Sequence, residues 1–131
     1  MITVEKNLEG EIESMNRKDF CGAGTTLISV AADGKVYPCA GLHEDEFCAG
    51  SIREQPMEII WKESEVFKKI RSMSILDIPE CKDCELKFIC GGGCHVDRHY
   101  AYGRLDIPTP NCKAQQEIYW YFLSEKLKEA Q

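Results

Sequence analysis

The chain has 131 residues, of which 44% are hydrophobic and 29% are charged, a composition typical of one soluble globular domain. Its formal net charge of -6 argues against a nucleic-acid or anionic-membrane surface, because both partners require a basic patch. The sequence has no run long and apolar enough to span a bilayer and no secretory signal pattern at its N-terminus, so we expect a cytoplasmic protein.

The first twenty residues are expected to form a linker or a short N-terminal helix. Leu8, Ile12 and Met15 recur among charged residues at helical spacing. We place the domain itself in residues 21–131.

A β-hairpin is predicted next. Residues 25–30 and 35–39 are rich in β-formers and flank Asp33-Gly34, a pair that favours a type I′ turn. Cys21 precedes the first run and Cys39 ends the second. Pairing of the two runs should therefore bring these two thiols to the same side of the fold.

The middle of the chain is predicted to be mostly helical. Residues 40–53 are short and turn-rich and could add one small strand. Cys48 belongs to no short-range spacing, and a lone cysteine is more often a small apolar side chain than a ligand. Residues 56–73 form a helical pattern in which Ser64 could cap a second segment. Their apolar stripe consists of Ile59, Ile60, Val66, Phe67, Ile70 and Met73.

Four of the eight cysteines lie in the segment from Cys81 to Cys94, which reads CKDCELKFICGGGC, and Cys112 follows beyond it. In a reducing cytoplasm, such a cluster indicates metal ligands rather than disulfides. A Cys-x-x-Cys pair directs two sulfurs at one ion or cluster, and glycine N–H groups can hydrogen-bond cluster sulfur. We expect His95 and His99 to form hydrogen bonds or face solvent rather than to bind metal, because seven better-placed thiols are available.

Residues 114–128 are predicted to form a helix whose apolar side chains cover more than half of its circumference. Two interpretations remain open: a face for a partner, or a central helix of the domain.

Taken together, the cysteines give C-x12-G-x4-C from Cys21 through Gly34 to Cys39, then C-x2-C-x5-C-x3-C, then Cys112. This pattern resembles the SPASM domain, the C-terminal auxiliary-cluster domain of radical SAM enzymes that modify ribosomal peptides and proteins. The resemblance covers about residues 21–112. It implies an α+β fold organised by clusters, in which a β-hairpin is followed by helices and Cys-rich loops.

By this resemblance the domain holds two 4Fe–4S clusters. Cys21, Cys39 and Cys94 would bind the first cluster. The second would be bound by Cys81, Cys84, Cys90 and Cys112. Many relatives have a fourth ligand of the first cluster shortly after the first cysteine, but residues 22–28 contain no Cys, Asp, Glu or His. The fourth position is then an open iron, an exogenous or substrate ligand, or Cys48.

The resemblance also implies what the chain does not do alone. Radical SAM catalysis uses a C-x3-C-x2-C loop, whereas here Cys90 and Cys94 are followed by Asp97 at the third position. We therefore expect no catalysis by this chain alone. Its expected partners are a radical SAM catalytic domain, in cis or in trans, and a ribosomal peptide or protein substrate, and its expected roles are electron transfer and substrate positioning.

Two other functions use the same thiols. A zinc-binding interaction module could be built from Cys81, Cys84, Cys90 and Cys94, which would leave Cys21, Cys39 and Cys112 unexplained. A freely acting electron carrier would hold the same clusters but would have exposed cluster edges and no obligate partner.

Overall fold

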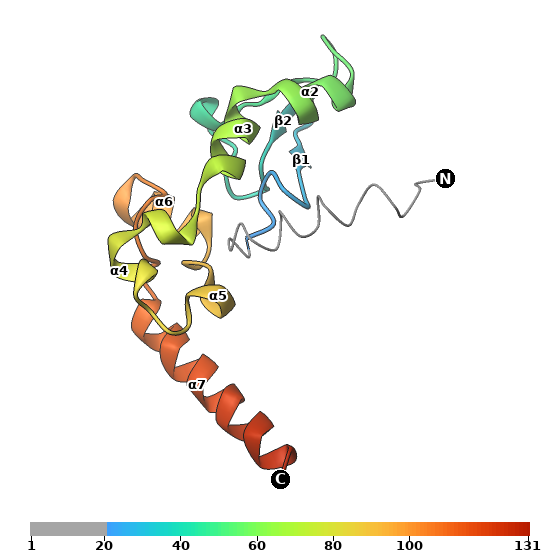
Figure 1. The fold of residues 1–131 in the computed structure, drawn as a ribbon. Coiled ribbons are helices and arrows are strands. Elements are labelled where there is room, and N and C mark those ends of the chain that lie inside the picture. Colours follow the sequence, from blue (N-terminus) through green and yellow to red (C-terminus); the bar gives the residue numbers. More distant parts are fainter. Residues whose placement is uncertain (1–20) are drawn as a thin grey trace.

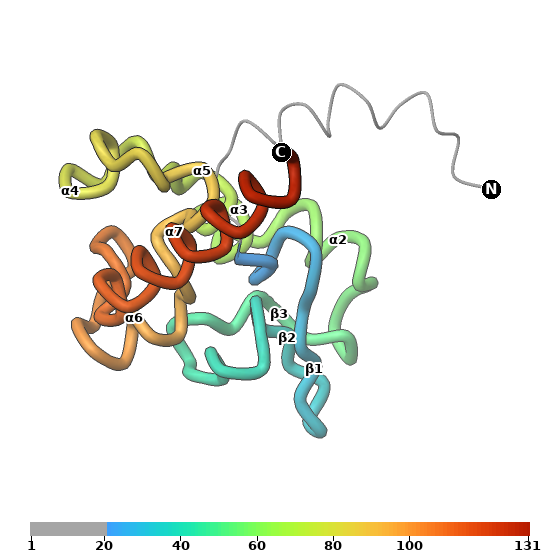
Figure 2. The backbone as a smooth tube through the Cα atoms, turned by 90° about the horizontal axis from the view of Figure 1, so that it is seen from below, coloured from blue at the N-terminus to red at the C-terminus, as the bar shows by residue number. Residues whose placement is uncertain are grey.

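The computed structural model describes residues 21–131 (Figure 1), so the helix or linker predicted for residues 1–20 lies outside the described residues. The predicted α+β class is confirmed: a three-stranded antiparallel sheet is followed by short helices and one long helix. Seen from below in Figure 2, the strands and α2 (Met57–Glu63) lie on one side of the molecule, and α4 (Pro79–Lys82) and α6 (His95–Tyr102) lie on the other. Within residues 21–131 we find no helix with the length and apolarity needed to cross a membrane.

The predicted hairpin is confirmed, with a different turn. Strand β1 (Ser29–Val30) pairs antiparallel with β2 (Lys35–Tyr37), with Val30 opposite Val36. The predicted type I′ turn centred on Asp33-Gly34 is wrong, because the Gly34 N–H bonds to the Ala31 carbonyl at 2.9 Å. Ala32 and Asp33 are therefore the central residues, and Gly34 follows them with φ of 90°.

The first strand is shorter than predicted. The Gly22 carbonyl accepts the N–H groups of Thr25, Thr26 and Leu27, which folds the start of the predicted strand into a tight loop. The Gly24 N–H then bonds to the Pro38 carbonyl at 3.0 Å and joins this loop to the end of β2. The predicted extra strand is β3 (Gly50–Ser51), which pairs with β2.

The predicted helical stretch divides at Ser64, as expected, although the Ser64 side chain forms no capping hydrogen bond. The Ser64 N–H bonds to the Ile60 carbonyl at the end of α2 (Met57–Glu63), and α3 (Glu65–Ser72) follows. Ile60 and Phe67 pack with Val36 in a buried cluster behind the sheet. The prediction that Ile59 faces the core is wrong, since it is 45% exposed. Adjacent residues on a helix point about 100° apart, and Ile60 occupies the inward position.

Short elements present the remaining cysteines. After η2 (Asp45–Phe47) in the sheet half, the chain forms η3 (Ile75–Asp77), α4 (Pro79–Lys82), α5 (Lys87–Cys90) and α6 (His95–Tyr102). Ile75, Ile78 and Cys81 form a small buried cluster of their own.

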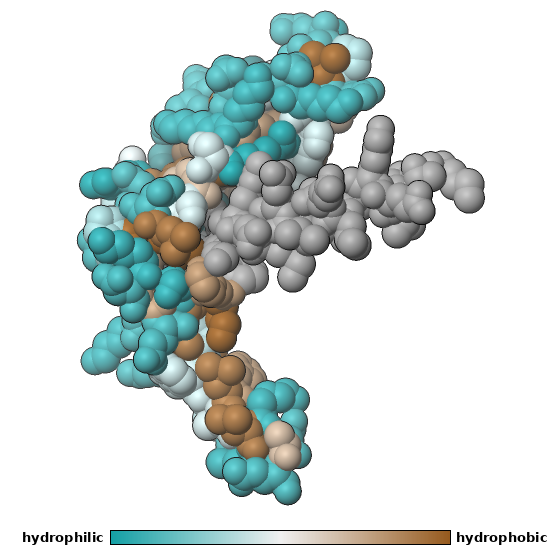
Figure 3. Space-filling view, viewed as in Figure 1, coloured by the Kyte–Doolittle hydropathy of each residue, from teal (hydrophilic) through white to brown (hydrophobic). Residues whose placement is uncertain are grey.

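The C-terminal helix α7 (Cys112–Glu129) begins two residues before the predicted start and projects away from the rest of the chain (Figure 1). None of its residues is buried, so it is not a central helix of the described domain. Figure 3 shows hydrophobic residues along this projecting helix. Trp120 and Tyr121 are 49% and 61% exposed.

Candidate metal centre

The first group of thiols joins the hairpin to the start of α6. Cys21 lies before the tight loop that leads to β1, farther from the strand than predicted, Cys39 lies two residues after β2, and Cys94 immediately precedes α6. Burial raises the pKa of Cys39, and the charges of Cys21 and Cys94 raise it further. The three sulfurs therefore lie close enough to interact electrostatically.

The second group comes from three helices and a loop. Cys81 lies in α4, Cys84 in the loop after it, Cys90 at the end of α5, and Cys112 at the start of α7. Burial, followed by the charges of Cys112, Cys90 and Cys84, raises the pKa of Cys81 to about 11. Without metal, Cys81 is therefore a neutral thiol near neutral pH, and a bound cation would favour the thiolate form of these neighbours.

Backbone N–H groups point at the sulfurs of both groups. Burial raises the pKa of Cys90, while hydrogen bonds from the N–H groups of Gly92 and Gly93 oppose that shift. The N–H groups of Gly41 and Leu42 act on Cys39 in the same way. Donors of this kind stabilise metal-bound thiolates and tune iron–sulfur centres.

The glycine turn before Cys94 depends on the absence of side chains. Gly91, Gly92 and Gly93 have φ values of 60°, 83° and 82°. A Cβ on Gly93 would lie 2.6 Å from the Cβ of Thr109, which is buried. The turn can therefore direct its N–H groups at Cys90 only with glycine at these positions.

His95 acts on the first group without having been predicted as a ligand. Its side chain is fully buried. Burial alone would raise the pKa of Cys21, but the side-chain hydrogen bond and electrostatic interaction with His95, together with backbone hydrogen bonds from His95 and Ala23, lower it. This agrees with the expectation that His95 forms a hydrogen bond. His99, in contrast, contacts two carboxylates away from the thiols.

Three polar residues near the thiols carried no signal in the sequence. The Cys90 thiol donates to Gln115 Oε1 at 3.2 Å, and Gln116 Nε2 donates to Cys112 Sγ at 3.4 Å. The guanidinium of Arg98, 1% exposed, donates to the Gly93 and Leu105 carbonyls at 3.3 and 2.6 Å. Arg98 therefore fixes the glycine turn to the segment that leads to α7.

Cys48 packs on the same buried cluster as Cys39, but its thiol is directed at a backbone carbonyl. Its thiol donates to the Gly50 carbonyl at 3.7 Å, and its side chain packs on the buried cluster of Tyr37, Leu42 and Phe47. These contacts are those of a small apolar side chain with a weak donor.

The donor set fits an iron–sulfur centre. Residues 21–131 include all eight cysteines, and no disulfide joins them. Seven of the thiols gather in two groups, each supplied with N–H donors to sulfur. Thiolate ligands with such donors are the usual environment of iron–sulfur clusters.

Comparison with known families agrees with this chemistry. The family model for SPASM, an iron–sulfur cluster-binding domain, matches residues 21–85. The chain therefore belongs to the SPASM family. The matched residues include Cys21, Cys39, Cys81 and Cys84, whereas Cys90, Cys94 and Cys112 lie beyond them.

Several curated proteins are similar to the SPASM chain. An AdoMet-dependent heme synthase from Methanosarcina barkeri is 39% identical over 92 residues, which are 70% of this chain and 25% of that protein. The mycofactocin maturase MftC from Mycolicibacterium smegmatis is 30% identical over 95 residues, or 72% of this chain and 24% of that protein. A PqqA peptide cyclase from Granulibacter bethesdensis is 30% identical over 95 residues, or 70% of this chain and 24% of that protein.

The SPASM chain spans about a quarter of the length of these relatives. No solved structure matches it.

Proposed function

We propose that this SPASM domain binds two auxiliary 4Fe–4S clusters. Cys21, Cys39 and Cys94 would hold the first. Cys81, Cys84, Cys90 and Cys112 would hold the second. The observation that carries the proposal is the division of seven thiols into two interacting groups with these members. The C-x2-C-x5-C-x3-C motif is thereby divided: its last cysteine, Cys94, belongs to the first group, and its other three cysteines belong to the second.

The same division disfavours the zinc alternative. A single four-thiolate zinc site would require Cys94 to join Cys81, Cys84 and Cys90. The charge of Cys94 instead acts on Cys39, and Cys112 is the strongest charged neighbour of Cys81. A zinc module would also leave the first group without a role.

We place the domain in residues 21–131 of this chain and assign it as the C-terminal part of a radical SAM peptide maturase. It would act in cis or in trans with the catalytic domain. Its SPASM family membership and its similarity to MftC and a PqqA peptide cyclase support this placement. Bound clusters would supply one-electron transfer. The protein's contributions are to hold the thiolates, to direct N–H donors at them and to position a peptide substrate.

The first cluster would have three protein ligands. The contact of the Cys48 thiol with the Gly50 carbonyl supports its exclusion as the fourth ligand. The fourth position would then be open to an added thiol or to a substrate cysteine.

Cluster number is tested by anaerobic reconstitution followed by iron, sulfide and zinc analysis. We expect about eight iron and eight sulfide per chain, the content of two 4Fe–4S centres. The Cys84→Ala variant should lose about half of both, whereas the matched Cys48→Ala variant should retain all. Stoichiometric zinc without sulfide, or equal losses in the two variants, would contradict the proposal.

A tetrapyrrole substrate is the second candidate, because the 39% identity with a heme synthase exceeds that with the peptide-modifying relatives. Binding to the cluster-loaded chain separates the two, measured by tryptophan fluorescence with a cysteine-containing peptide and with a porphyrin. Saturable binding of the porphyrin alone would replace the peptide assignment.

A further inference from the structure

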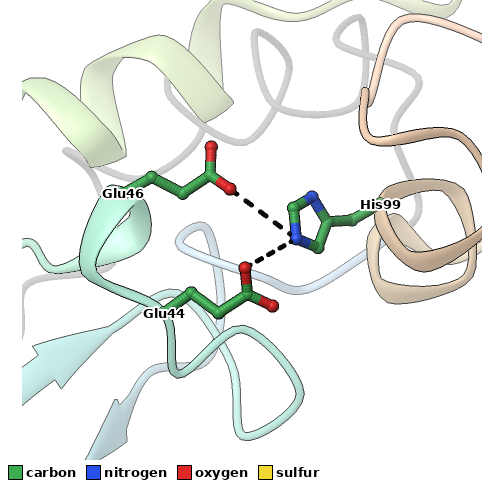
Figure 4. A group of neighbouring side chains, drawn as sticks. All are labelled: Glu44, Glu46 and His99. Carbon is green, nitrogen blue, oxygen red and sulfur yellow. Dashed lines mark hydrogen bonds and ion pairs between the residues drawn. The ribbon is translucent and has the colours of Figure 1, made fainter.

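A second group of metal-binding side chains lies outside the thiols. Glu44 and Glu46 flank Asp45 at the start of η2, and His99 lies on α6. Figure 4 shows both carboxylates directed at the imidazole ring of His99. His99 Nε2 lies 3.0 Å from Glu44 Oε2 and 3.7 Å from Glu46 Oε1.

These separations are compatible with a shared cation in addition to the hydrogen bond between His99 and Glu44. The single Nε2 position can donate one proton to one acceptor, and the 3.7 Å separation to Glu46 is too long for a hydrogen bond. Ligand atoms bound tetrahedrally at about 2.1 Å from one metal ion lie about 3.4 Å apart. The three donor atoms all lie within 4.8 Å of one another, so small side-chain adjustments would bring them to that spacing.

The surroundings hold the imidazole and one carboxylate in place. The side chain of His99 is 11% exposed, and its ring packs against the ring of Phe47 at 4.9 Å in an edge-on arrangement. Hydrogen bonds from His99 and then from the Tyr100 hydroxyl hold the pKa of Glu44 below its usual range. A carboxylate held by a neighbouring hydroxyl is a common feature of metal sites.

Charge and access also favour a cation. Within residues 21–131, the ion pairs of Glu44 and Glu46 are both with His99, whereas the nearby Lys35 pairs with Asp33 and Asp45. Glu46 and His99 line a cavity of about 530 Å³, and the two glutamates are 40% and 62% exposed. An ion can therefore reach the three side chains from solvent.

We propose that Glu44, Glu46 and His99 bind one divalent first-row transition metal ion such as zinc. One imidazole with two carboxylates is a donor set that such ions accept, and the remaining positions would be filled by water. Glu44 lies five residues after Cys39, and His99 lies five residues after Cys94. The ion would thus join the two segments that carry Cys39 and Cys94.

The test is a zinc titration of the anaerobic, cluster-loaded chain, with bound zinc and iron both measured after dialysis against a weak chelator. We expect one zinc ion per chain with the iron content and visible absorption unchanged. His99→Ala should abolish this binding, and Glu44→Gln and Glu46→Gln should weaken it by more than the factor of about 10–100 typical of residues outside the ligand set.

His43→Ala is the matched control, because His43 stacks on Tyr37 and contacts Ser29 rather than the glutamates. It should bind zinc like the parent. The two Glu→Gln variants preserve side-chain size, so they test the ligands even where His99→Ala disturbs packing. Absence of zinc uptake, uptake accompanied by loss of iron, or equal uptake by all variants would overturn the proposal.

Discussion

Substitution of Gly93 by alanine tests whether the glycine turn presents the thiols. A left-handed backbone costs a residue with a Cβ about 1–2 kcal/mol. The new Cβ would also lie 2.6 Å from the Cβ of Thr109, and such overpacking costs about 1–3 kcal/mol. The total is about 2–5 kcal/mol. Part of this strain should be relieved by movement of the turn, which would withdraw the Gly93 N–H from Cys90.

Gly103→Ala provides the matched control. Gly103 has a similar φ of 67°, yet its Cβ would meet nothing within 4 Å. We expect Gly103→Ala to cost only the backbone term, so Gly93→Ala should unfold at an apparent midpoint lower than that of Gly103→Ala by about 4–12 °C. Iron and sulfide should also fall in Gly93→Ala alone. Equal midpoints and equal iron content in the two loaded variants would refute the role given to the turn.

Three further outcomes are expected. His95→Leu removes a donor to Cys21, so the reduction potential of the first cluster should fall by about 59 mV for each tenfold weakening of the reduced state. The potential is measured by EPR titration, and an unchanged value would exclude this role. Trp120→Ser should leave the unfolding free energy of the chain within about 0.5 kcal/mol but weaken its binding to a catalytic domain, measured by calorimetry; a large loss of stability would contradict the exposed position. Because the pKa of Cys81 is raised to about 11, protons compete with metal at this thiol, so chelator should remove iron faster at about pH 6 than at about pH 8.

The sequence predicted the hairpin that brings two thiols to one side of the fold, but it did not predict the local backbone geometry of that hairpin. Cys21 and Cys39 could be placed together because alternating β-formers around Asp33-Gly34 predict a hairpin whatever turn closes it. The predicted turn type was wrong, since Asp-Gly also fits a longer loop in which only the glycine is left-handed. Local hydrogen bonds from Thr25, Thr26 and Leu27 to the Gly22 carbonyl shorten the first strand, although the side chains of this run are typical of a strand.

The burial of two residues that support the thiols was not predictable. His95 and Arg98 lie on α6 among polar residues, and the sequence contains nothing to indicate that both are almost completely buried. Their burial follows from the packing of α6 against the glycine turn and the segment before α7. Glu44 and His99 are 55 positions apart, so their contact is likewise a product of the fold.

Because α7 projects from the domain, the orientation of its first turn determines the position of its C-terminal end. Its first residue is Cys112, and Gln115 and Gln116 contact Cys90 and Cys112 near the same end. An 18-residue helix is about 27 Å long, so a rotation of about 10° at its base moves its tip by about 5 Å. If Cys112 binds the second cluster, insertion of that cluster fixes the direction in which α7 presents its aromatic residues. A chain without that cluster would then present the helix to a catalytic domain in a different direction.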